Sequence, residues 1–523
     1  MTLLEANQIK LFMKDRLLVD IEKLQIDKGD VIGLVGRNGS GKTTLLEILA
    51  GQREPENGTI ARNGTCELLP QLKRTDSTQS GGEVTQEYIK QALASSPALL
   101  LADEPTTHLD TGHIAWLEKK LGNWQGALVL VSHDRAFLDA LCTAIWELEE
   151  GKIKQYKGNY SDYAAQKELE LRQHEQAFEK YEKKKRQLEE ALALKVKKAE
   201  RATKAPKKVS LSEARITGAK PYFAKKQKKL EQTAKAIETR LEKLEKVEKA
   251  REAPAIKMEL HNEESFKNRI ILRAEKLKGQ IGKKALWREA SFEVRGGDKL
   301  AIIGANGSGK TTLLKKLLSE EKGITMSPAV KVGYFSQNID ILDVEKSILE
   351  NVSSASSQGE SLIRTVLARL HFFRDDVHKP VRVLSGGERV KVALAKLFVS
   401  DLNTLVLDEP TNFLDLQSVE ALESLLKDYS GSVLFVSHDR RLVENVATSI
   451  LEISNGEIKL FEGTYQEFRE YVPKERDAGE DVRLIIETRL TDVLSRLSIA
   501  PTPELEQEFQ RLLAEKRKLQ GNG

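Results

Sequence analysis

The sequence has 523 residues, of which 40% are hydrophobic and 31% are charged, and its net charge is only +4. This length predicts about two to four domains, because a single hydrophobic core seldom grows so large. No stretch approaches the roughly 18 apolar residues of a membrane-spanning helix, and the first residues lack the pattern of a secretory signal. We therefore expect a cytoplasmic protein with no membrane segment of its own.

The chain repeats one order of motifs in two segments, which indicates an internal duplication. Each copy alternates buried β-branched runs with helical patterns, and this predicts an α/β fold with a largely parallel sheet. A segment rich in Lys, Glu, Arg and Leu separates the copies. The expected domains are a first α/β domain over 1–160, a helical hairpin linker over 161–268, a second α/β domain over 269–472, and a short helical C-terminal extension over 473–523.

In the first copy an apolar strand, residues 31–35, enters a glycine-rich turn that matches GxxxxGK[ST] and continues into a helical pattern. In such a loop the glycines let backbone N–H groups converge on phosphate oxygens at a helix N-terminus. The lysine reaches the terminal phosphates, and the threonine ligates Mg²⁺. The residues expected to bind ATP, with Thr43 also a metal ligand, are Gly36, Asn38, Gly39, Gly41, Lys42, Thr43 and Thr44.

A second buried strand, residues 99–103, ends in Asp-Glu-Pro-Thr. Asp103 is expected to hold the metal and Glu104 to polarise the attacking water as a general base, since adjacent buried acids are costly without such a role. His133 follows Asp103 by 30 residues, and the same offset recurs in the second copy, which favours a catalytic role for this histidine. The cysteines, Cys66 and Cys142, lack metal-ligand spacing and are expected to be buried free thiols.

The linker carries two apolar runs at three-four spacing, which predict two antiparallel helices packed as a coiled coil. The runs are Leu171, Phe178, Tyr181, Leu188 and Leu192, then Leu230, Ala234, Ile237, Leu241, Leu244 and Val247. Between them Pro206, Gly218 and Pro221 oppose a helix, so the tip is expected at about 201–223.

Positive charge is concentrated on this hairpin. Residues 161–250 hold 25 Lys and Arg against 15 Asp and Glu, and residues 195–229 hold 13 against 2. A narrow basic protrusion suits a phosphate-rich partner such as RNA, because neutralising phosphates releases counterions. The alternative is a solvated coiled coil with an ordinary charge bias.

The second copy repeats the motifs at matched spacing. After the strand at 300–304, the expected ATP ligands are Gly304, Asn306, Gly307, Gly309, Lys310, Thr311 and Thr312. A strand at 405–408 ends in Asp408, expected to hold the metal with Thr311, and is followed by Glu409 as the second general base. His438 lies 30 residues after Asp408. Beyond about residue 476, the pattern predicts two helical stretches separated by Pro501, Thr502 and Pro503.

Together these motifs resemble the ATP-binding cassette (ABC) ATPases. The resemblance implies that Gln71 and Gln337 bind the nucleotide and Mg²⁺. It also implies two signature motifs that bind ATP, namely Ser80, Gly81, Gly82 and Glu83, and Ser385, Gly386, Gly387 and Glu388.

In that family each signature closes over ATP held by the other cassette. The expected sites are therefore composite within one monomeric chain, pairing Lys42 with Ser385 and Lys310 with Ser80. Asp110 and Asp415 match the family's D-loop position. Phe12 is the expected adenine-stacking residue of the first half, whereas the matching place in the second half, near Ile281, is not aromatic.

Tandem cassettes joined by a basic helical linker are similar to the ABC-F subfamily, which acts on ribosomes. Gln71 and Ser80 are nine residues apart, but Gln337 and Ser385 are 48 apart, so the first cassette is expected to lack most of its helical subdomain. This trimming, the long linker and segments such as KPYFAKKQKKL resemble the Vga-type antibiotic-resistance proteins of Gram-positive bacteria.

The resemblance implies ribosome protection. The ATP-bound form would occupy the tRNA exit site of the 70S ribosome, contact 23S rRNA and the P-site tRNA, and extend its linker toward the peptidyl-transferase centre. It would dislodge lincosamide, streptogramin A and pleuromutilin drugs, and hydrolysis would release it. No DNA partner is expected. Two alternatives stay open: an ABC-F translation factor for stalled ribosomes, and the ATPase subunit of a transporter.

Overall fold

A computed structural model describes most of the chain, which divides into two compact units, Met1–Glu462 and Gly463–Gly523. In the second unit, the one helix that the structure describes is α14 (Tyr465–Glu470). Ser80, Gln337, most of the expected linker tip and most of the C-terminal extension lie outside the described residues. These are 1–13, 16–71, 81–107, 109–202, 219–247, 267–282, 284–319, 321–336, 341–356, 358–471, 493, 509–511 and 513.

The first cassette contains a six-stranded sheet in the order β5-β6-β7-β3-β8-β9, in which only the β8–β9 pair is antiparallel. A smaller antiparallel sheet has the order β2-β1-β4. The strands are β1 (Thr2–Met13), β2 (Arg16–Asp27), β3 (Val31–Val35), β4 (Asn57–Arg62), β5 (Cys66–Leu69), β6 (Leu99–Asp103), β7 (Ala127–Val131), β8 (Ala144–Glu149) and β9 (Lys152–Lys157). The helices are α1 (Lys42–Ala50), α2 (Gly81–Ala94), α3 (Thr111–Gly122) and α4 (Arg135–Leu141).

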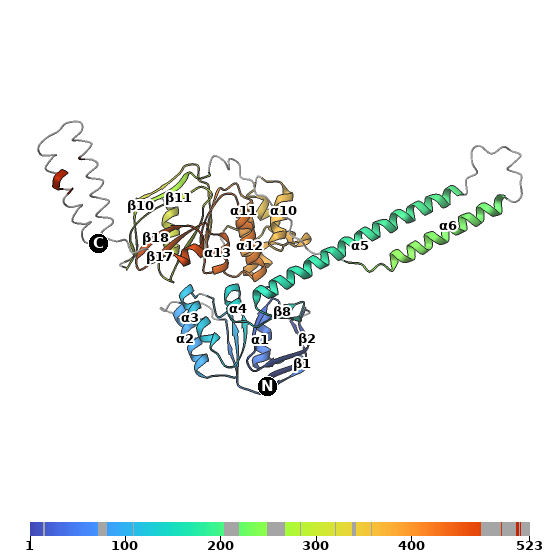
Figure 1. Cartoon of the computed structure of the whole chain (residues 1–523), viewed down its shortest axis with the longest axis horizontal. Helices are drawn as coiled ribbons and strands as arrows, with labels where there is room; N and C mark the ends of the chain where they lie inside the picture. The colour runs from blue at the N-terminus through green and yellow to red at the C-terminus, as the bar shows by residue number, and fades with distance from the viewer. Residues whose placement is uncertain are drawn as a thin grey trace. The chain divides into compact units, whose positions relative to one another are not determined.

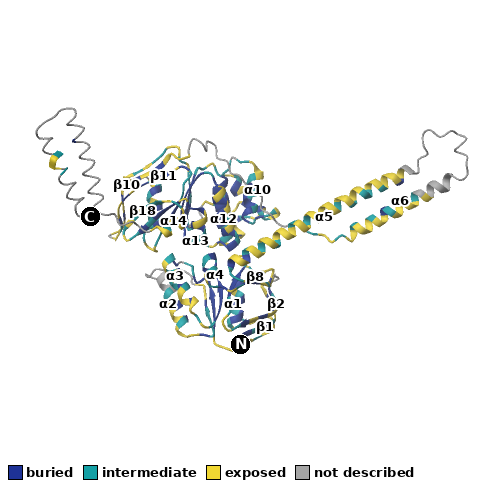
Figure 2. Cartoon of the chain, in the orientation of Figure 1, coloured by how far each residue is buried: buried dark blue, intermediate teal, exposed yellow. Residues whose placement is uncertain are grey.

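The centre of this sheet is apolar on both faces. Every residue of β6 and β7 is buried, as expected for parallel strands covered by helices on both sides (Figure 2). Each fully buried Leu or Val side chain contributes about 1.5–3 kcal/mol. Because β3 and β6 run parallel to β7 between them, their carboxyl ends meet at one edge of the sheet, which brings the glycine loop after β3 close to the acids after β6.

The second cassette repeats this architecture, with sheet orders β14-β15-β16-β12-β17-β18 and β11-β10-β13 (Figure 1). Its strands are β10 (Ile270–Ile281), β11 (Lys284–Arg295), β12 (Lys299–Gly304), β13 (Ile324–Met326), β14 (Val332–Phe335), β15 (Thr404–Asp408), β16 (Ser432–Val436), β17 (Ser449–Ser454) and β18 (Glu457–Glu462). Its main helices are α8 (Lys310–Leu318), α11 (Gly386–Val399), α12 (Leu416–Asp428) and α13 (Arg440–Val446). The predicted α/β fold, with two similar nucleotide-binding domains, is confirmed.

The two cassettes differ in the segment that leads from the end of the β5 or β14 strand to the signature motif. In the second, residues 336–385 hold α9 (Ile348–Ser353), α10 (Glu360–Arg369) and two short 3₁₀ helices, η2 (Arg374–His378) and η3 (Val381–Val383). In the first, only residues 70–80 join β5 to α2, and so short a segment has no room for such a subdomain.

The linker forms two long helices, α5 (Tyr160–Ala202) and α6 (Ala219–Glu242), which lie side by side and antiparallel (Figure 1). At 43 residues, α5 rises about 65 Å. The apolar stripe is largely as predicted, with Ala199 and Ala234 buried. Even so, neither helix is long and apolar enough to span a bilayer, nor is any other described helix.

Three details of the linker differ from the prediction. Leu171 is 51% exposed, so the contact stripe of α5 begins further along the helix. α6 ends at Glu242, so Leu244 and Val247 follow the helix instead of belonging to it. Pro221 lies in the first turn of α6, where its missing N–H costs nothing because first-turn N–H groups have no partner within the helix.

The cysteines are free, as expected, with Cys142 buried and Cys66 half-buried.

Candidate nucleotide sites

The glycine loop after β3 ends on Gly41, which precedes α1 in a left-handed conformation with φ +104°. No side chain caps α1, so its first-turn N–H groups are left for an anion, which is the arrangement that binds phosphate. Lys42 donates from Nζ to the carbonyl oxygens of Gly36 at 2.8 Å and Arg37 at 3.1 Å. Burial lowers the pKa of Lys42, against the opposing effect of nearby acids.

The second loop has the same geometry. Gly309 precedes α8 with φ +102° and no side-chain cap, and Lys310 donates to the carbonyl oxygens of Gly304 at 2.9 Å and Ala305 at 3.1 Å. Within the described part of the chain, the buried hydroxyls of Ser40 and Ser308 have no hydrogen-bond partner. Both loops therefore fit a bound phosphate chain. Their remaining predicted ligands lie in the same turns, namely Asn38, Gly39, Thr43, Thr44, Asn306, Gly307, Thr311 and Thr312.

Two side chains with oxygen atoms that could bind a metal lie beside each loop. The Thr43 hydroxyl donates to Asp103 at 2.6 Å, and the Thr311 hydroxyl donates to Asp408 at 3.1 Å. Burial raises the pKa of both aspartates, although the threonine hydrogen bonds oppose this. Hard oxygen donors next to a phosphate loop fit Mg²⁺, which prefers one or two carboxylates together with substrate phosphates.

The predicted general bases lie against the predicted histidines. Glu104 Oε1 is 3.2 Å from His133 Nε2, and Glu409 Oε1 is 3.3 Å from His438 Nε2. Both glutamates have left-handed backbones, with φ +52° and +50°, which is rare away from glycine and occurs at functional sites.

The second pair places a neutral histidine beside a glutamate that is about half ionised at neutral pH. Burial raises the pKa of Glu409 to about 7, against the lowering effect of Lys310. Burial also lowers the pKa of His438 to about 4, and the Lys310 charge adds to this. A carboxyl with a pKa near the working pH is suited to accept a proton from water.

The loop of each cassette is hydrogen-bonded to the D-loop of the other. The backbone N–H of Asn38 donates to Asp415 Oδ2 at 3.0 Å, and that of Asn306 donates to Asp110 Oδ2 at 2.9 Å. Each aspartate also caps the helix that follows it, α12 or α3. The two cassettes therefore meet reciprocally, each completing the other's phosphate loop.

The second signature motif lies beside the first phosphate loop. A Cβ added to Gly387 would lie 3.1 Å from Nδ2 of Asn38, whose amide donates to the carbonyl oxygen of Phe413 at 2.9 Å. Ser385 caps α11, and Glu388 closes a reciprocal capping box with it. The structure thus brings Ser385, Gly386, Gly387 and Glu388 toward the Lys42 loop. The other signature begins α2 at Gly81, Gly82 and Glu83, and its Ser80 lies outside the described residues.

The remaining predicted ligands are Gln71, Gln337 and Phe12. Gln71 is exposed just beyond β5, and Gln337 lies outside the described residues. Phe12 is 40% exposed near the turn of the β1–β2 hairpin, and Ile281 is 56% exposed at the equivalent turn of β10–β11. The stacking role of Phe12 stays a prediction.

Sequence reasoning missed Arg37, which the second loop replaces with Ala305. Its Nε donates to the side-chain oxygen of Gln417 at 3.1 Å, adding a third link between the first loop and the second cassette. The difference between Arg37 and Ala305 at the same loop position was the signal in the sequence that could have found it.

These features define a class: a tandem cassette ATPase with two composite nucleotide sites in one chain. Residues 19–75 and 287–412 match a family model described as ABC transporter, and residues 146–215 match a second model with the same description. The chain binds and hydrolyses ATP.

Among curated relatives, the ribosome protection protein VmlR of Bacillus subtilis (strain 168) is 32% identical, over 96% of this chain and 95% of its own. The erythromycin resistance ATP-binding protein MsrA of Staphylococcus epidermidis is 34% identical, over 87% of this chain and 98% of its own. A solved archaeal ribosome recycling factor, aABCE1, bound to the stalk protein aP1, has a TM-score of 0.59 at 17% identity and covers 88% of this chain and 91% of its own, a likeness of fold. The chain belongs to the ABC-F subfamily of ATP-binding cassette proteins.

Proposed function

We propose that this protein protects bacterial ribosomes from antibiotics that act at the peptidyl-transferase centre. Its partners are the 70S ribosome, with 23S rRNA and the P-site tRNA, and it works in the cytoplasm as a single chain. The drugs are lincosamides, streptogramin A compounds and pleuromutilins. The similarity to VmlR, a ribosome protection protein, and to MsrA, an erythromycin resistance protein, supports the class of activity, and MsrA adds erythromycin as a drug to test.

The observation that carries the proposal is the reciprocal pair of contacts, Asn38 with Asp415 and Asn306 with Asp110. With these contacts the cassettes form a clamp whose closure depends on both phosphate loops. ATP between the cassettes adds contacts that only the closed form makes, so binding favours closure, and loss of the terminal phosphate as ADP and phosphate form removes them.

In the hydrolytic step Glu104 or Glu409 accepts a hydrogen bond from the attacking water and takes its proton. His133 and His438 hold the glutamates in place. Mg²⁺, when bound by Thr43 with Asp103 or by Thr311 with Asp408, neutralises charge on the phosphates.

Expression of the chain in a drug-susceptible Gram-positive host tests the proposal. We expect raised inhibitory concentrations for the three drug classes without a change in drug accumulation. Unchanged tolerance together with ribosome co-sedimentation would favour a translation factor, and increased drug efflux would favour a transporter subunit.

A second experiment replaces Glu104 and Glu409 by Gln together. Without the general bases, ATP is held but not cleaved, and we expect a ribosome complex that survives pelleting in ATP. Turnover at the parent rate would refute the general-base assignment, whatever the drug phenotype.

A further inference from the structure

The turn that follows each site histidine carries an arginine that crosses to the other cassette. Arg135 donates from Nη2 to Glu423 on α12 at 2.7 Å, and Arg440 donates from Nη1 to Glu118 on α3 at 2.9 Å. The two pairs are equivalent, because each glutamate lies eight residues after the D-loop aspartate of its own cassette.

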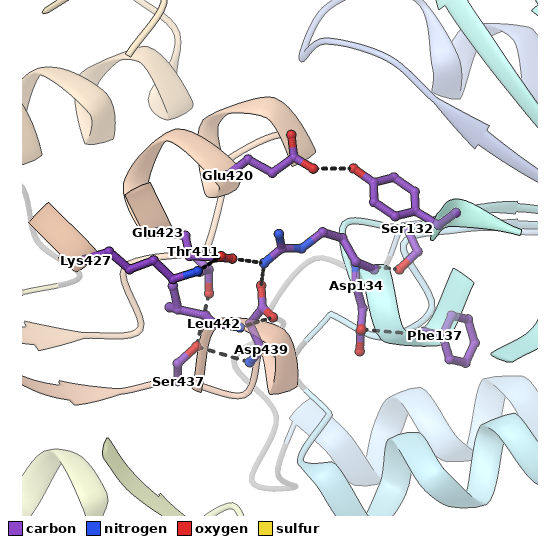
Figure 3. Close-up of polar contacts among 12 residues, drawn as sticks. Ser132, Asp134, Phe137, Thr411, Glu420, Glu423, Lys427, Ser437, Asp439 and Leu442 are labelled. Carbon is purple, nitrogen blue, oxygen red and sulfur yellow. Dashed lines mark hydrogen bonds and ion pairs between the residues drawn. The ribbon is translucent and has the colours of Figure 1, made fainter. Parts of the chain in front are cut away.

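The two pairs are unequally buried. The side chains of Arg135 and Glu423 are 5% and 11% exposed, whereas those of Arg440 and Glu118 are 21% and 19% exposed. Glu423 also accepts from Lys427 at 2.9 Å. In Figure 3, Glu423 and Asp439 of the second cassette point toward the segment of the first cassette that carries Asp134. Breaking a buried pair is costly because one charge stays unpaired.

The Arg135 turn is tied to the catalytic acid of its own cassette. The Asp134 N–H donates to the Ser132 hydroxyl at 3.1 Å, and that hydroxyl lies 3.0 Å from the hydroxyl of Thr106, two residues after Glu104. Holding Arg135 from the second cassette therefore holds His133 against Glu104.

The same face of α12 also holds the root of the linker. The Tyr160 hydroxyl, in the first turn of α5, donates to Glu420 at 2.8 Å, and Glu420 lies one helical turn before Glu423. At the equivalent position of α3 stands Ala115, so this contact is not a by-product of the duplication. Arg441 adds a second link, donating to the Ser161 hydroxyl at 2.7 Å.

The root of α5 is anchored to the first cassette by a buried carboxylate. Glu147 accepts from the Tyr163 hydroxyl at 2.8 Å and from Lys167 at 2.6 Å. The linker helix is thus fixed to one cassette and hydrogen-bonded to the other, and separation of the cassettes must break the second attachment.

We propose that Glu420 and Glu423 on α12 couple closure of the cassettes to the linker. Glu423 is a positioning residue: by binding Arg135 it fixes the segment that carries His133. Glu420, by accepting from Tyr160, fixes the direction of α5. The closed cassettes are therefore competent for hydrolysis and present the linker in one orientation. The coupling is argued from these contacts alone. Its biological role, which is to time the linker's action on the ribosome, rests on the proposed function.

Distance measurements between spin labels test the coupling without a ribosome. The labels go on two exposed residues, Gln176 of α5 and Lys459 of β18, in a chain that carries Cys66→Ser, Cys142→Ala and the two Glu→Gln changes that trap ATP. We expect one narrow distance distribution in ATP. Tyr160→Phe, Glu420→Ala and the double variant should each broaden this distance distribution to the same extent, because each removes the same Tyr160–Glu420 hydrogen bond. A hydrogen bond to a charged group is worth about tenfold in the equilibrium between the single orientation of the linker and its other orientations.

Glu118→Gln is the matched control, since it weakens cassette pairing through the Glu118–Arg440 contact, in which no residue of α5 takes part. It should reduce the closed population without broadening the distance in that population. In the hydrolytic protein, Glu423→Gln should lower kcat about tenfold with little change in KM for ATP, whereas Tyr160→Phe should lower kcat less, because it removes no contact of Arg135. An unchanged distribution in Tyr160→Phe, or a parent kcat in Glu423→Gln, overturns the coupling. If Tyr160→Phe and Glu420→Ala broaden the distance distribution but the parent protein gives no drug protection, the proposed function is refuted and the coupling stands.

Discussion

The backbone N–H of Asn38 is hydrogen-bonded to the carboxylate of Asp415, although the two residues are 377 positions apart in the chain. Hydrogen bonds from Ser418 and Asn38 hold the pKa of Asp415 down to about 2, overcoming the raising effect of burial. The aspartate is therefore charged at any working pH, and it ties the first phosphate loop to the second cassette.

Asp415→Ala should lower ATP turnover about tenfold, because it removes a charged hydrogen bond across the cassette interface. The substitution also removes the N-cap of α12, which costs about 1 kcal/mol. Asp415→Asn keeps a cap and separates the two effects: it should restore the melting temperature more fully than the turnover. Steady-state ATPase rates and thermal unfolding of both variants make the comparison, and full activity in Asp415→Ala would contradict the role of this contact.

Gly387→Ala should weaken closure around the first nucleotide. A Cβ at this position would lie 2.5 Å from the carbonyl oxygen of Phe413, a backbone atom that cannot easily move aside. Such overpacking costs about 1–3 kcal/mol, so turnover should fall about tenfold or more. Gly386→Ala is the control, because a Cβ there meets nothing within 4 Å. Equal ATPase rates for the two variants would show that Gly387 does not lie against the Phe413 carbonyl, which accepts from Asn38 of the first phosphate loop, in the closed enzyme.

Glu147→Ala should destabilise the first cassette and loosen the linker root. Glu147 is 4% exposed and accepts from Tyr163 and Lys167, so its removal leaves a buried hydroxyl without this acceptor, whereas Lys167 keeps solvent and Glu149 as partners. The expected cost is about 1–3 kcal/mol. Glu149→Ala, on the same strand but 64% exposed, is the control and should melt close to the parent. Calorimetry gives both values, and equal melting of the two variants would refute the anchoring role.

Much of this architecture could be predicted from the sequence because it is local. The strand before each glycine loop, the buried strand before each acid pair and the apolar stripe of the linker are periodic patterns that their own segments determine. Where the pattern reached past a helix end, as at Leu244 and Val247, the spacing continued but the helix did not.

The contacts between cassettes could not be predicted in this way. Nothing in the neighbourhood of Arg135 indicates that its partner is Glu423, since the pair forms only when two separately folded domains meet. The duplication was an available signal, because an arginine follows both site histidines at the same offset. The sequence shows Glu420 on α12 where α3 has Ala115, but only the structure, which places Tyr160 beside α12, shows that this difference creates a contact with the linker.

Asp134 and Asp439 face the same cassette interface, and burial together with the Asp439 charge raises the pKa of Asp134 to about 6 in the closed form, from an ordinary value of 3.8. With the cassettes apart, Asp134 is no longer beside Asp439, and we expect its pKa to lie closer to the ordinary value. Closure should therefore take up a proton below about pH 6 and be least favoured above it, where the Asp134 carboxylate is ionised near a like charge. Asp134→Asn keeps the cap of α4 but cannot ionise, so closure in ATP at pH 7.5 should become about tenfold more favourable than in the parent. Distance measurements from pH 5 to 7.5 test this: the parent should lose closed population as pH rises and the variant should not, and parallel pH profiles would assign the dependence to another group.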